Sequence, residues 1–462
     1  MNHLRRKIGS VHFVGIGGIG MSGLAEILVR QGFTVTGSDL ASSSVTDHLV
    51  EIGVAVQVGH KAENVGSAKA VVYSSAVSQD NPELVAAHKL GIPVIRRAEM
   101  LAELMRIKRG IAVAGTHGKT TTTSLIGTVF TEAGLDPTVI VGGVVRGLGT
   151  NARMGEGELL IAEADEYDRS FLKLTPTLAV ITNVEAEHLD TYGTFDELKD
   201  AFVHFANSVP FYGAVIVCID DPGLLSLLPR FERPIITYGE SPQADLRAVD
   251  VEIGAKASCT VVAGDEELGK LELPITGKHN LRNALAALAV ARELEIPFEK
   301  AANALKGFSG VRRRFEVRGH EKGVLVVDDY AHHPTEVRAT LSAARKAHEG
   351  KVIAVFQPHL FSRTRAFGKQ FAQELLAADE VFITDIYPAR EKPIVGVTAE
   401  TIVNEAREFG HKAVHYIPSR VDLAAEIEKV LEGGELVITL GAGDIYKTSD
   451  ELLTRLRGGE AK

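Results

Sequence analysis

The sequence has little cysteine and no long apolar run. Only Cys218 and Cys259 occur among its 462 residues, and their separation matches neither a zinc motif nor a redox motif. Two such cysteines are typical of reduced thiols in a cytosolic protein, so a structural disulfide is not expected. No apolar run approaches the roughly 20 residues that cross a bilayer. These absences predict a cytoplasmic protein.

The sequence also lacks an excess of positive charge. Lysine and arginine total 50 against 60 acidic residues, which gives a formal net charge of −10. That balance argues against nucleic acid or an anionic membrane as the main partner. Arg5, Arg6 and Lys7 precede an apolar stretch, as in a signal peptide. That stretch, VHFVGIGGIGM, is rich in glycine and has no small-residue cleavage site behind it, so we expect a buried strand and turn.

Short apolar runs alternate with helical patterns along the chain and predict the α/β class. Continuous runs of this length suit parallel strands that are covered on both faces. The predicted strands are Val11–Val14, Ile111–Ala114, Leu159–Ala162, Leu178–Thr182, Val324–Val327, Val352–Phe356 and Leu436–Leu440. Gly32 and Gly134 stand where two helices should end. At roughly 150 residues per domain, the length suggests about three domains. We expect them at 1–107, 108–311 and 312–462.

A glycine-rich turn opens the first predicted domain. Gly15, Gly17 and Gly20 form GxGxxG between a strand and a helix, and Asp39 ends the next strand. Glycines let the backbone approach a diphosphate at a helix N-terminus, and the acidic residue can hold a ribose hydroxyl. The pattern fits a nicotinamide dinucleotide, a UDP-sugar, or glycines that merely allow a tight turn. A second polar turn, with Ser74 and Ser75, follows the strand 70–73 at the same sheet edge and does not decide between them.

The sequence GTHGKTT, residues 115–121, is a stronger signal. It follows a predicted strand and opens an amphipathic helix, so its backbone N–H groups can surround phosphate oxygens. Lys119 supplies a charge for the β and γ phosphates, and Thr120 supplies a hydroxyl for Mg²⁺. Val113 stands where the usual P-loop has its first glycine, so the loop is a shortened variant anchored by Gly115. We expect it to bind ATP.

Acidic residues follow two further predicted strands. Ligands of α/β sheets gather beyond the carboxyl ends of the strands, where carboxylates can hold a cation that bridges phosphates. Glu163 and His188 come directly after or close to strand ends, and we expect them to be functional. For Asp165, Glu166 and Glu187 we favour solvated loop residues or helix caps.

The motifs GTHGKTT, EADEYD, NVEAEHLD, GKHNLRNALAA, GVRRRFE, DDYAHHPTE and QPHLFSRTR occur in this order. With them, the chain resembles the Mur ligase family over essentially its full length. The resemblance implies a Rossmann-like N-terminal domain for the UDP-sugar and a central P-loop ATPase-like domain with a parallel sheet. It also implies a C-terminal Rossmann-like α/β domain for the amino acid. The implied reaction joins the lactyl carboxylate of UDP-N-acetylmuramate to L-alanine through an acyl phosphate, with ATP and Mg²⁺, in peptidoglycan precursor synthesis.

The resemblance also assigns residues to each substrate. For the UDP-sugar they are Gly15, Gly17, Gly18, Gly20, Ser38, Asp39, Ser74 and Ser75. For ATP they are Gly115, Thr116, His117, Gly118, Lys119, Thr120, Thr121, His279, Asn280, Asn283, Arg314 and Asp329. Those for the metal are Thr120, Glu163 and His188, and those for the amino acid are Tyr330, His332 and Arg363. The implied catalytic residues are Lys119, Glu163, His188 and His332.

Several points stay open at this level. Arg365 is as easily a solvated neighbour, and His333 and His359 are equally consistent with structural roles. Leu360 stands where some relatives carry an arginine, which weakens the choice of amino acid. A recycling ligase that attaches a preformed tripeptide to the same UDP-sugar is the nearest alternative, although DDYAHHPTE and HLFSRTR favour alanine addition. A nicotinamide-dependent oxidoreductase and a regulatory nucleotide-binding protein are the more distant alternatives.

Overall fold

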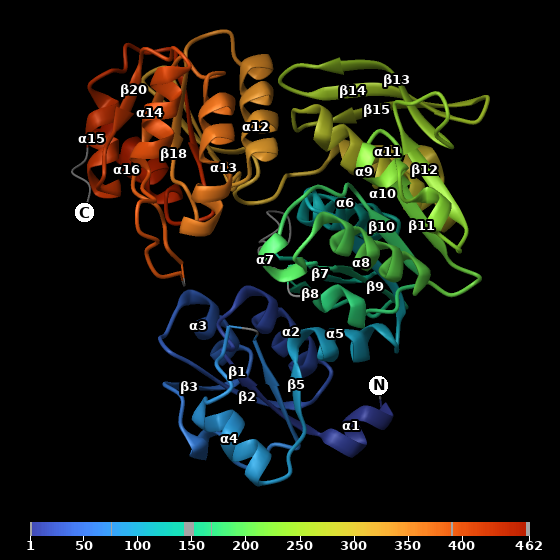
Figure 1. Cartoon of the computed structure of the whole chain (residues 1–462). Helices are drawn as coiled ribbons and strands as arrows, with labels where there is room; N and C mark the ends of the chain where they lie inside the picture. The colour runs from blue at the N-terminus through green and yellow to red at the C-terminus, as the bar shows by residue number, and fades with distance from the viewer. Residues whose placement is uncertain (1, 75, 143–151, 168, 390, 459–462) are drawn as a thin grey trace. The chain divides into compact units, whose positions relative to one another are not determined.

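The computed structural model describes residues 2–74, 76–142, 152–167, 169–389 and 391–458. These residues form three sheets with helices packed around them (Figure 1). The predicted α/β class is confirmed. The chain divides into two compact units, the first made of Met1–Asp250, Cys259–Leu271 and Arg282–Ser309, and the second of Val251–Ser258, Glu272–Leu281 and Gly310–Lys462.

The N-terminal part contains a five-stranded sheet in the order β3-β2-β1-β4-β5, in which each neighbouring pair is parallel. Its elements are α1 (Asn2–Ile8), β1 (Ser10–Val14), α2 (Ile19–Arg30), β2 (Thr34–Asp39), α3 (Ser44–Glu51), β3 (Ala55–Val58), η1 (Ala62–Val65), β4 (Ala70–Tyr73), α4 (Pro82–Lys89), β5 (Val94–Arg96) and α5 (Arg97–Met105). From β1 the chain adds β2 and β3 on one side of the sheet and then β4 and β5 on the other, so the order of the strands changes direction between β1 and β4. In open α/β sheets the crevice at such a point is where ligands bind. The glycine-rich turn follows β1 and therefore lies at this point.

A ten-stranded sheet follows, in the order β15-β14-β13-β12-β11-β10-β6-β9-β7-β8. Its strands are β6 (Arg109–Ala114), β7 (Thr138–Ile140), β8 (Ala152–Arg153), β9 (Leu159–Glu163), β10 (Leu178–Ile181), β11 (Ala214–Cys218), β12 (Ile235–Gly239), β13 (Leu246–Ile253), β14 (Ala257–Ala263) and β15 (Glu266–Leu273). Its helices are α6 (Lys119–Glu132), η2 (Ser170–Lys173), α7 (Leu189–Tyr192), α8 (Phe195–Asn207), α9 (Pro222–Leu225), η3 (Leu228–Arg230), α10 (Lys278–Glu293) and α11 (Phe298–Lys306). β6 pairs in parallel with both β10 and β9. The carboxyl ends of these three strands therefore meet at one edge, which carries the phosphate loop.

The C-terminal sheet has the order β16-β17-β21-β18-β19-β20, in which β16 is antiparallel to β17 and the other pairs are parallel. Its strands are β16 (Glu316–Glu321), β17 (Val324–Asp329), β18 (Val352–Phe356), β19 (Glu380–Ile383), β20 (Val414–Tyr416) and β21 (Leu436–Leu440). Its helices are α12 (Pro334–Ala347), α13 (Phe361–Leu375), α14 (Glu400–Glu408), η4 (Arg420–Asp422), α15 (Leu423–Glu428) and α16 (Tyr446–Leu456). Alternate residues of β18 enter two separate apolar clusters, so both faces of the sheet are covered. This explains why the strand is apolar throughout.

Each of the seven strands predicted from apolar runs is present, with ends that differ by no more than two residues. Helices α2 and α6 end just before Gly32 and Gly134, which have φ of +80° and +82°, as predicted. Cys218 and Cys259 are buried free thiols, and burial raises the pKa of each to about 12. Within the described parts of the chain, no helix has the length and apolar content that crossing a membrane requires.

Candidate functional site

Two glycines shape the phosphate loop between β6 and α6. Gly115 has φ of +132°, and a Cβ at this position would lie 2.1 Å from the Thr182 hydroxyl oxygen. Gly118 has φ of +84°, and a Cβ there would lie 2.7 Å from the Asn283 amide oxygen. Residues with side chains rarely adopt these angles, and neither position has room for one. The bare backbone of the loop can therefore approach a phosphate closely.

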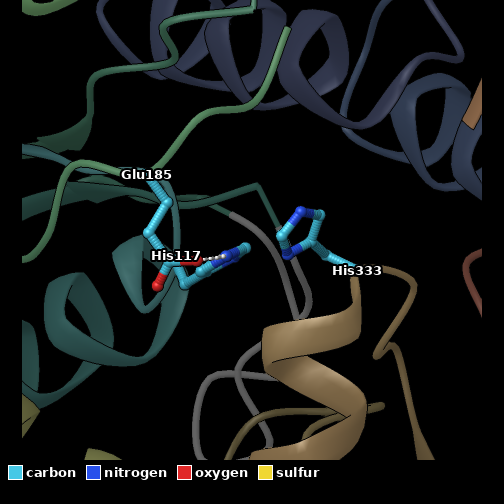
Figure 2. A group of neighbouring side chains, drawn as sticks. All are labelled: His117, Glu185 and His333. Atoms are coloured by element: carbon cyan, nitrogen blue, oxygen red, sulfur yellow. Dashed lines mark ion pairs between the residues drawn. The ribbon is translucent and has the colours of Figure 1, made fainter. Parts of the chain in front are cut away.

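The loop is fixed to the end of β10 by Asn183. The Asn183 Oδ1 accepts a hydrogen bond from the His117 N–H at 2.8 Å, and its Nδ2 donates to the His117 carbonyl at 3.0 Å. The Thr116 hydroxyl oxygen accepts from the Glu185 N–H at 2.9 Å. Figure 2 shows the ring of His117 beside Glu185, whose carboxylate lies 3.7 Å from Nε2. Asn183 was not among the predicted site residues, because nothing in the sequence distinguishes it from other polar residues that follow a strand.

Lys119 begins α6, and its ammonium group points back over the loop. Nζ donates to the carbonyl oxygens of Gly115 at 2.6 Å and Thr116 at 3.1 Å. It also lies 2.8 and 3.0 Å from the two carboxylate oxygens of Glu166. Burial is the largest single effect and would lower the pKa of Lys119, but the charges of Glu166, Asp165 and Glu187 and the hydrogen bond to Glu166 together outweigh it, so the pKa is raised. The lysine therefore remains a cation at the position where a phosphate would be bound.

Glu166 is a correction to the sequence analysis, which expected a solvated acid. Its side chain is 1% exposed, because the segment after β9 turns inward and Tyr192 donates to the Glu166 carbonyl at 2.6 Å. His188 lies 3.4 Å from the same carboxylate. Glu187 was also expected to be solvated and is instead buried, whereas Asp165 accepts from the Tyr167 N–H at 3.1 Å, as a turn residue should. A periodic pattern carries no information on which loop acid turns inward.

His188 belongs to the same polar cluster as Lys119. Burial alone would lower its pKa, but the hydrogen bond to Glu166 and the charges of Glu187 and Glu166 together outweigh that effect, so the pKa is raised. The residue has φ of +56°, a left-handed conformation that is uncommon for residues other than glycine. Strained backbone of this kind is often held at functional sites. The structure therefore brings His188 to the phosphate loop through Glu166.

Thr120 and Glu163 provide two side-chain oxygen atoms beside the loop that could bind a metal ion, here called the oxygen-donor pair. The Thr120 hydroxyl hydrogen-bonds to Glu163, and the Glu163 carboxylate accepts from the Gly142 N–H at 2.6 Å. Burial raises the pKa of Glu163, despite these hydrogen bonds. Mg²⁺ prefers oxygen ligands and usually takes one or two protein carboxylates together with waters and substrate phosphates. The donor pair fits such an ion. Among the described contacts, His188 approaches the Glu166 carboxylate and not Thr120 or Glu163.

Three of the predicted ATP residues, His279, Asn280 and Asn283, lie at the start of α10. Asn280 is buried, and its side chain donates to the Thr276 carbonyl at 2.7 Å. The ring of His279 lies against Gly277, where a Cβ would be 2.6 Å from its Cε1. Asn283, one turn along the helix, has its amide against Gly118 of the phosphate loop. Of the three, Asn283 is therefore the one whose contact with the loop the structure describes.

The glycine-rich turn after β1 is held by the end of β2. The carbonyl of Ser38 accepts from the N–H groups of Gly15 at 2.9 Å and Ile16 at 3.0 Å. The Asp39 Oδ2 accepts from the Gly17 N–H at 2.7 Å. Asp39 thus organises the turn, in addition to the ribose contact predicted for it.

Other predicted sugar-site residues differ in exposure. The Ser38 side chain is fully buried, so its hydroxyl faces the interior. Ser74 follows β4, and its hydroxyl accepts from the Ala76 N–H at 3.3 Å. Ser75 lies outside the described residues. The sequence analysis missed Arg97, whose guanidinium would be 3.1 Å from a Cβ on Gly20 and so lies beside the first turn of α2.

In the second unit, the predicted amino-acid residues lie around two histidine rings. The His332 Nδ1 is 2.8 Å from the Tyr330 carbonyl, which can only accept, so the neutral ring carries its lone pair on Nε2. The His359 ring lies 5.9 Å from the His332 ring, and its Nδ1 lies 3.5 Å from Nη1 of Arg363. Burial, with the nearby charges of His332 and Arg363, lowers the pKa of His359 to about 3. His359 is therefore neutral and can accept from Arg363.

Two arginines that precede β16, Arg313 and Arg314, lie against the Tyr330 ring. The guanidinium carbons of Arg313 and Arg314 lie 4.9 and 5.3 Å from the ring centroid. Arg313, which the sequence analysis did not single out, also pairs with buried Asp328 at 3.1 Å. Cations over an aromatic face are stabilised by its quadrupole. These contacts hold the segment with Arg313 and Arg314 against Tyr330.

Asp329, one of the predicted ATP residues, is buried at the end of β17. Its two oxygens accept from the Phe315 N–H at 2.7 Å and the Ala331 N–H at 2.8 Å. Burial raises its pKa to about 6, although Arg314 and these hydrogen bonds oppose the shift. Its contact with ATP stays a prediction.

A phosphate loop with an adjacent oxygen-donor pair and a glycine turn at a sheet's switch point define a multidomain nucleotide-binding enzyme of the α/β class. Family models match along the chain: "Mur ligase family, catalytic domain" at residues 10–109, "Mur ligase middle domain" at 113–291, and "Mur ligase, glutamate ligase domain" at 313–443. The chain belongs to the Mur ligase family. Membership in a ligase family overturns the nicotinamide oxidoreductase alternative.

Individual relatives agree with this assignment. The chain is 53% identical over 456 residues to the UDP-N-acetylmuramate--L-alanine ligase of Sorangium cellulosum, which covers 98% of this chain and 97% of the relative. The crystal structure of UDP-N-acetylmuramate-alanine ligase from Thermotoga maritima matches with a TM-score of 0.83 and 29% identity, over 97% of this chain and 99% of the other. That of a murein peptide ligase from Psychrobacter arcticus matches with a TM-score of 0.71 and 25% identity, over 98% and 100%.

Proposed function

We propose that the chain is the ATP-dependent ligase that forms an amide between the lactyl carboxylate of UDP-N-acetylmuramate and L-alanine, releasing ADP and phosphate. The observation that carries this proposal is the full-length identity of 53% to a ligase named for that reaction. The reaction is a step in peptidoglycan precursor synthesis. We also propose that the enzyme acts in the cytoplasm, which its two free cysteines support because thiols stay reduced there.

The central part of the chain binds ATP in this proposal. Lys119 contacts the transferring phosphate, and the glycines of the loop let main-chain N–H groups surround the others. The further ATP residues are Thr116, His117, Thr121, His279, Asn280, Asn283, Arg314 and Asp329. Support comes from the position of Lys119 over the loop, where its Nζ lies 2.6 Å from the Gly115 carbonyl.

Thr120 and Glu163 would hold Mg²⁺, with His188 as the third residue assigned to it. When bound, the ion neutralises charge that develops on the phosphate oxygens. The adjacent Thr120 hydroxyl and Glu163 carboxylate support this assignment.

The glycine-rich turn binds the UDP-sugar and the second unit binds the amino acid. The sugar residues are Gly15, Gly17, Gly18, Gly20, Ser38, Asp39, Ser74 and Ser75. Arg363 binds the alanine carboxylate, because a planar guanidinium matches a carboxylate with two hydrogen bonds. The neutral His359 beside Arg363 supports this role, since it orients the guanidinium without competing for the anion.

The chemistry requires activation, because an amine cannot expel oxide from a carboxylate at neutral pH. Transfer of the γ-phosphoryl group gives an acyl phosphate, and the amine then attacks through a tetrahedral intermediate that loses phosphate. Phosphoryl transfer needs mostly positioning and charge neutralisation, which Lys119 supplies. The amine must lose a proton, and His332 is our candidate acceptor. Its Nδ1 faces the Tyr330 carbonyl at 2.8 Å, so Nε2 is the basic atom.

The test is phosphate release with UDP-N-acetylmuramate against a panel of amino acids and the tripeptide, followed by product mass. We expect release that requires both the UDP-sugar and alanine, and a product heavier by one alanyl residue. A product formed with the tripeptide and not with alanine would establish the recycling ligase instead. ATP hydrolysis without either co-substrate would favour a regulatory nucleotide-binding protein.

A further inference from the structure

The N-terminal sheet carries a buried carboxylate that the proposed chemistry does not use. Glu83 lies in the first turn of α4, and its side chain is fully buried. Its Oε2 accepts from the Ser38 hydroxyl at 2.6 Å. Its Oε1 accepts from the Asn64 side chain at 2.6 Å and from the Lys61 N–H at 3.2 Å. One carboxylate therefore joins α4 to the end of β2 and to the segment after β3.

Two histidines complete this cluster. The His60 Nδ1 lies 2.9 Å from the Ser38 hydroxyl oxygen and 3.4 Å from Glu83 Oε2, and the His12 Nε2 lies 3.5 Å from Glu83 Oε2. Ser38 has a single hydroxyl proton, which it donates to the carboxylate. His60 must then donate its Nδ1 proton to the Ser38 oxygen. The charge on Glu83 thus sets the direction of each hydrogen bond around Ser38.

Glu83 is ionised at neutral pH despite its burial. Burial alone would raise its pKa, but the close approach of His12 and the hydrogen bonds from Ser38 and Asn64 together outweigh it and lower the pKa to about 2. A buried charge is costly unless it is paired and hydrogen-bonded. Its neighbours are therefore held in the one arrangement that satisfies it.

Ser38 links this cluster to the glycine-rich turn. Its carbonyl accepts the N–H groups of Gly15 at 2.9 Å and Ile16 at 3.0 Å, and the next residue, Asp39, accepts from the Gly17 N–H at 2.7 Å. The place of the turn thus depends on the place of the β2 end. Glu83 holds that end from inside the sheet.

We propose that Glu83 is a positioning residue for the UDP-sugar, which acts through Ser38 on the glycine-rich turn at residues 15–20. The inference rests on the proposed function, in which this turn holds the diphosphate. Main-chain N–H groups bind phosphate well only when their geometry is held to within about 0.5 Å by the groups behind them. Glu83 is the ionised side chain behind Ser38.

The test is the Glu83→Gln variant of the full-length enzyme. Glutamine keeps the shape but replaces one acceptor by an NH₂ group that faces donors. We expect the dissociation constant for UDP-N-acetylmuramate, measured by calorimetry without ATP or alanine, to rise at least about tenfold. The KM for the UDP-sugar should rise equally. The kcat at saturation and the KM for ATP should stay within about twofold of the wild type.

A matched control and a double variant separate positioning from general destabilisation. Glu26 on α2 is also buried and pairs with Arg30 at 2.7 Å and His48 at 3.5 Å, with no described contact to the turn. Glu26→Gln should leave the UDP-sugar dissociation constant within about twofold. The double variant, Ser38→Ala with Glu83→Gln, should bind the UDP-sugar no more weakly than whichever single variant binds it less well. Both substitutions act on one interaction, so their effects should not add.

The remaining outcomes are also decisive. An unchanged UDP-sugar dissociation constant in a folded Glu83→Gln enzyme overturns the proposal, as does an equal loss of ATP affinity and kcat. Should Glu83→Gln not fold, Ser38→Ala alone carries the test, and wild-type binding by that variant overturns it. A wild-type enzyme that does not bind the UDP-sugar would refute the proposed function instead.

Discussion

The ammonium group of Lys119 lies 2.8 Å from the Glu166 carboxylate, and both side chains are largely withdrawn from water, with exposures of 16% and 1%. The pair sits over the phosphate loop, where the same ammonium also donates to the Gly115 carbonyl. A buried lysine would otherwise lose its charge to desolvation. Glu166 therefore keeps Lys119 charged and fixes its direction, so a phosphate meets a cation that is already in place.

Glu166→Gln should weaken both stability and turnover. Removal of one partner of a buried ion pair typically costs about 3 kcal/mol or more, because the other charge stays buried. We expect the unfolding free energy to fall by about that amount, and kcat to fall at least about tenfold because Lys119 loses its fixed position. Denaturant unfolding and phosphate release measure the two effects. Glu197→Gln, which removes an exposed carboxylate paired with Arg169, is the control and should change neither appreciably.

Lys119→Ala should separate chemistry from sugar binding. The loss of a preorganised charge at a transferring group costs roughly 10²–10³ in rate, so turnover should fall at least that far. The dissociation constant for the UDP-sugar should stay within about twofold, because the glycine turn belongs to another sheet. An equal loss of both would contradict the division of labour between the domains. Lys199→Ala, which removes a partly exposed lysine of α8 that lies 3.6 Å from Asp196, controls for the loss of a lysine as such.

Gly115→Ala should disable the phosphate loop. The new Cβ would lie 2.1 Å from Thr182 Oγ1, at φ of +132°, so the loop has to shift. We expect the KM for ATP to rise at least about tenfold and the midpoint of thermal unfolding to fall. Gly134→Ala is the matched control, because φ is +82° there but nothing lies within 4 Å. It should cost about 1 kcal/mol of stability and leave the KM for ATP unchanged. Equal effects of the two variants on ATP would contradict the assignment.

The strands and the phosphate loop could be predicted from the sequence because their signals are local. An apolar run of five residues such as Val352–Phe356 can satisfy both covered faces of a parallel sheet, and the structure has that strand with the same ends. Gly115 and Lys119 lie within one short loop, so their spacing alone indicates a phosphate cradle. Such features need no knowledge of tertiary contacts.

The polar clusters could not be predicted, because they depend on contacts between distant segments. Glu166 meets Lys119 across 47 positions, and Ser38 meets Glu83 across 45. In the sequence, Glu166 is one of four acids that follow the predicted strand Leu159–Ala162, and Glu83 is an ordinary acidic residue at a helix start. Only the fold distinguishes them from solvated residues.

Arg363→Lys should weaken alanine binding, although the substitution keeps the positive charge. A guanidinium can form two parallel hydrogen bonds to a carboxylate, and lysine forms a single point contact. Loss of one charge-assisted hydrogen bond costs about 2 kcal/mol, so the KM for alanine should rise about 30-fold. The KM for the UDP-sugar should not change. Arg365→Ala, two residues along α13 and exposed, is the control. A large effect of Arg365→Ala, with none of Arg363→Lys, would mean that Arg365 and not Arg363 binds the alanine carboxylate.

Glu83 should also make the stability of the protein depend on pH in the acid range. Its pKa is lowered from 4.5 to about 2, so its contribution to stability is fully present above the unfolded value of 4.5 and is lost as the pH falls toward 2. The shift corresponds to about 3 kcal/mol, of which about 1 kcal/mol should be gone by about pH 3.5. The difference in unfolding free energy between the wild type and Glu83→Gln should therefore be constant from about pH 6 to 8 and narrow below 4.5. Unfolding both proteins in the same buffers measures it. A gap that stays constant down to about pH 3.5 would mean that Glu83 is not held as a hydrogen-bonded anion in the folded state.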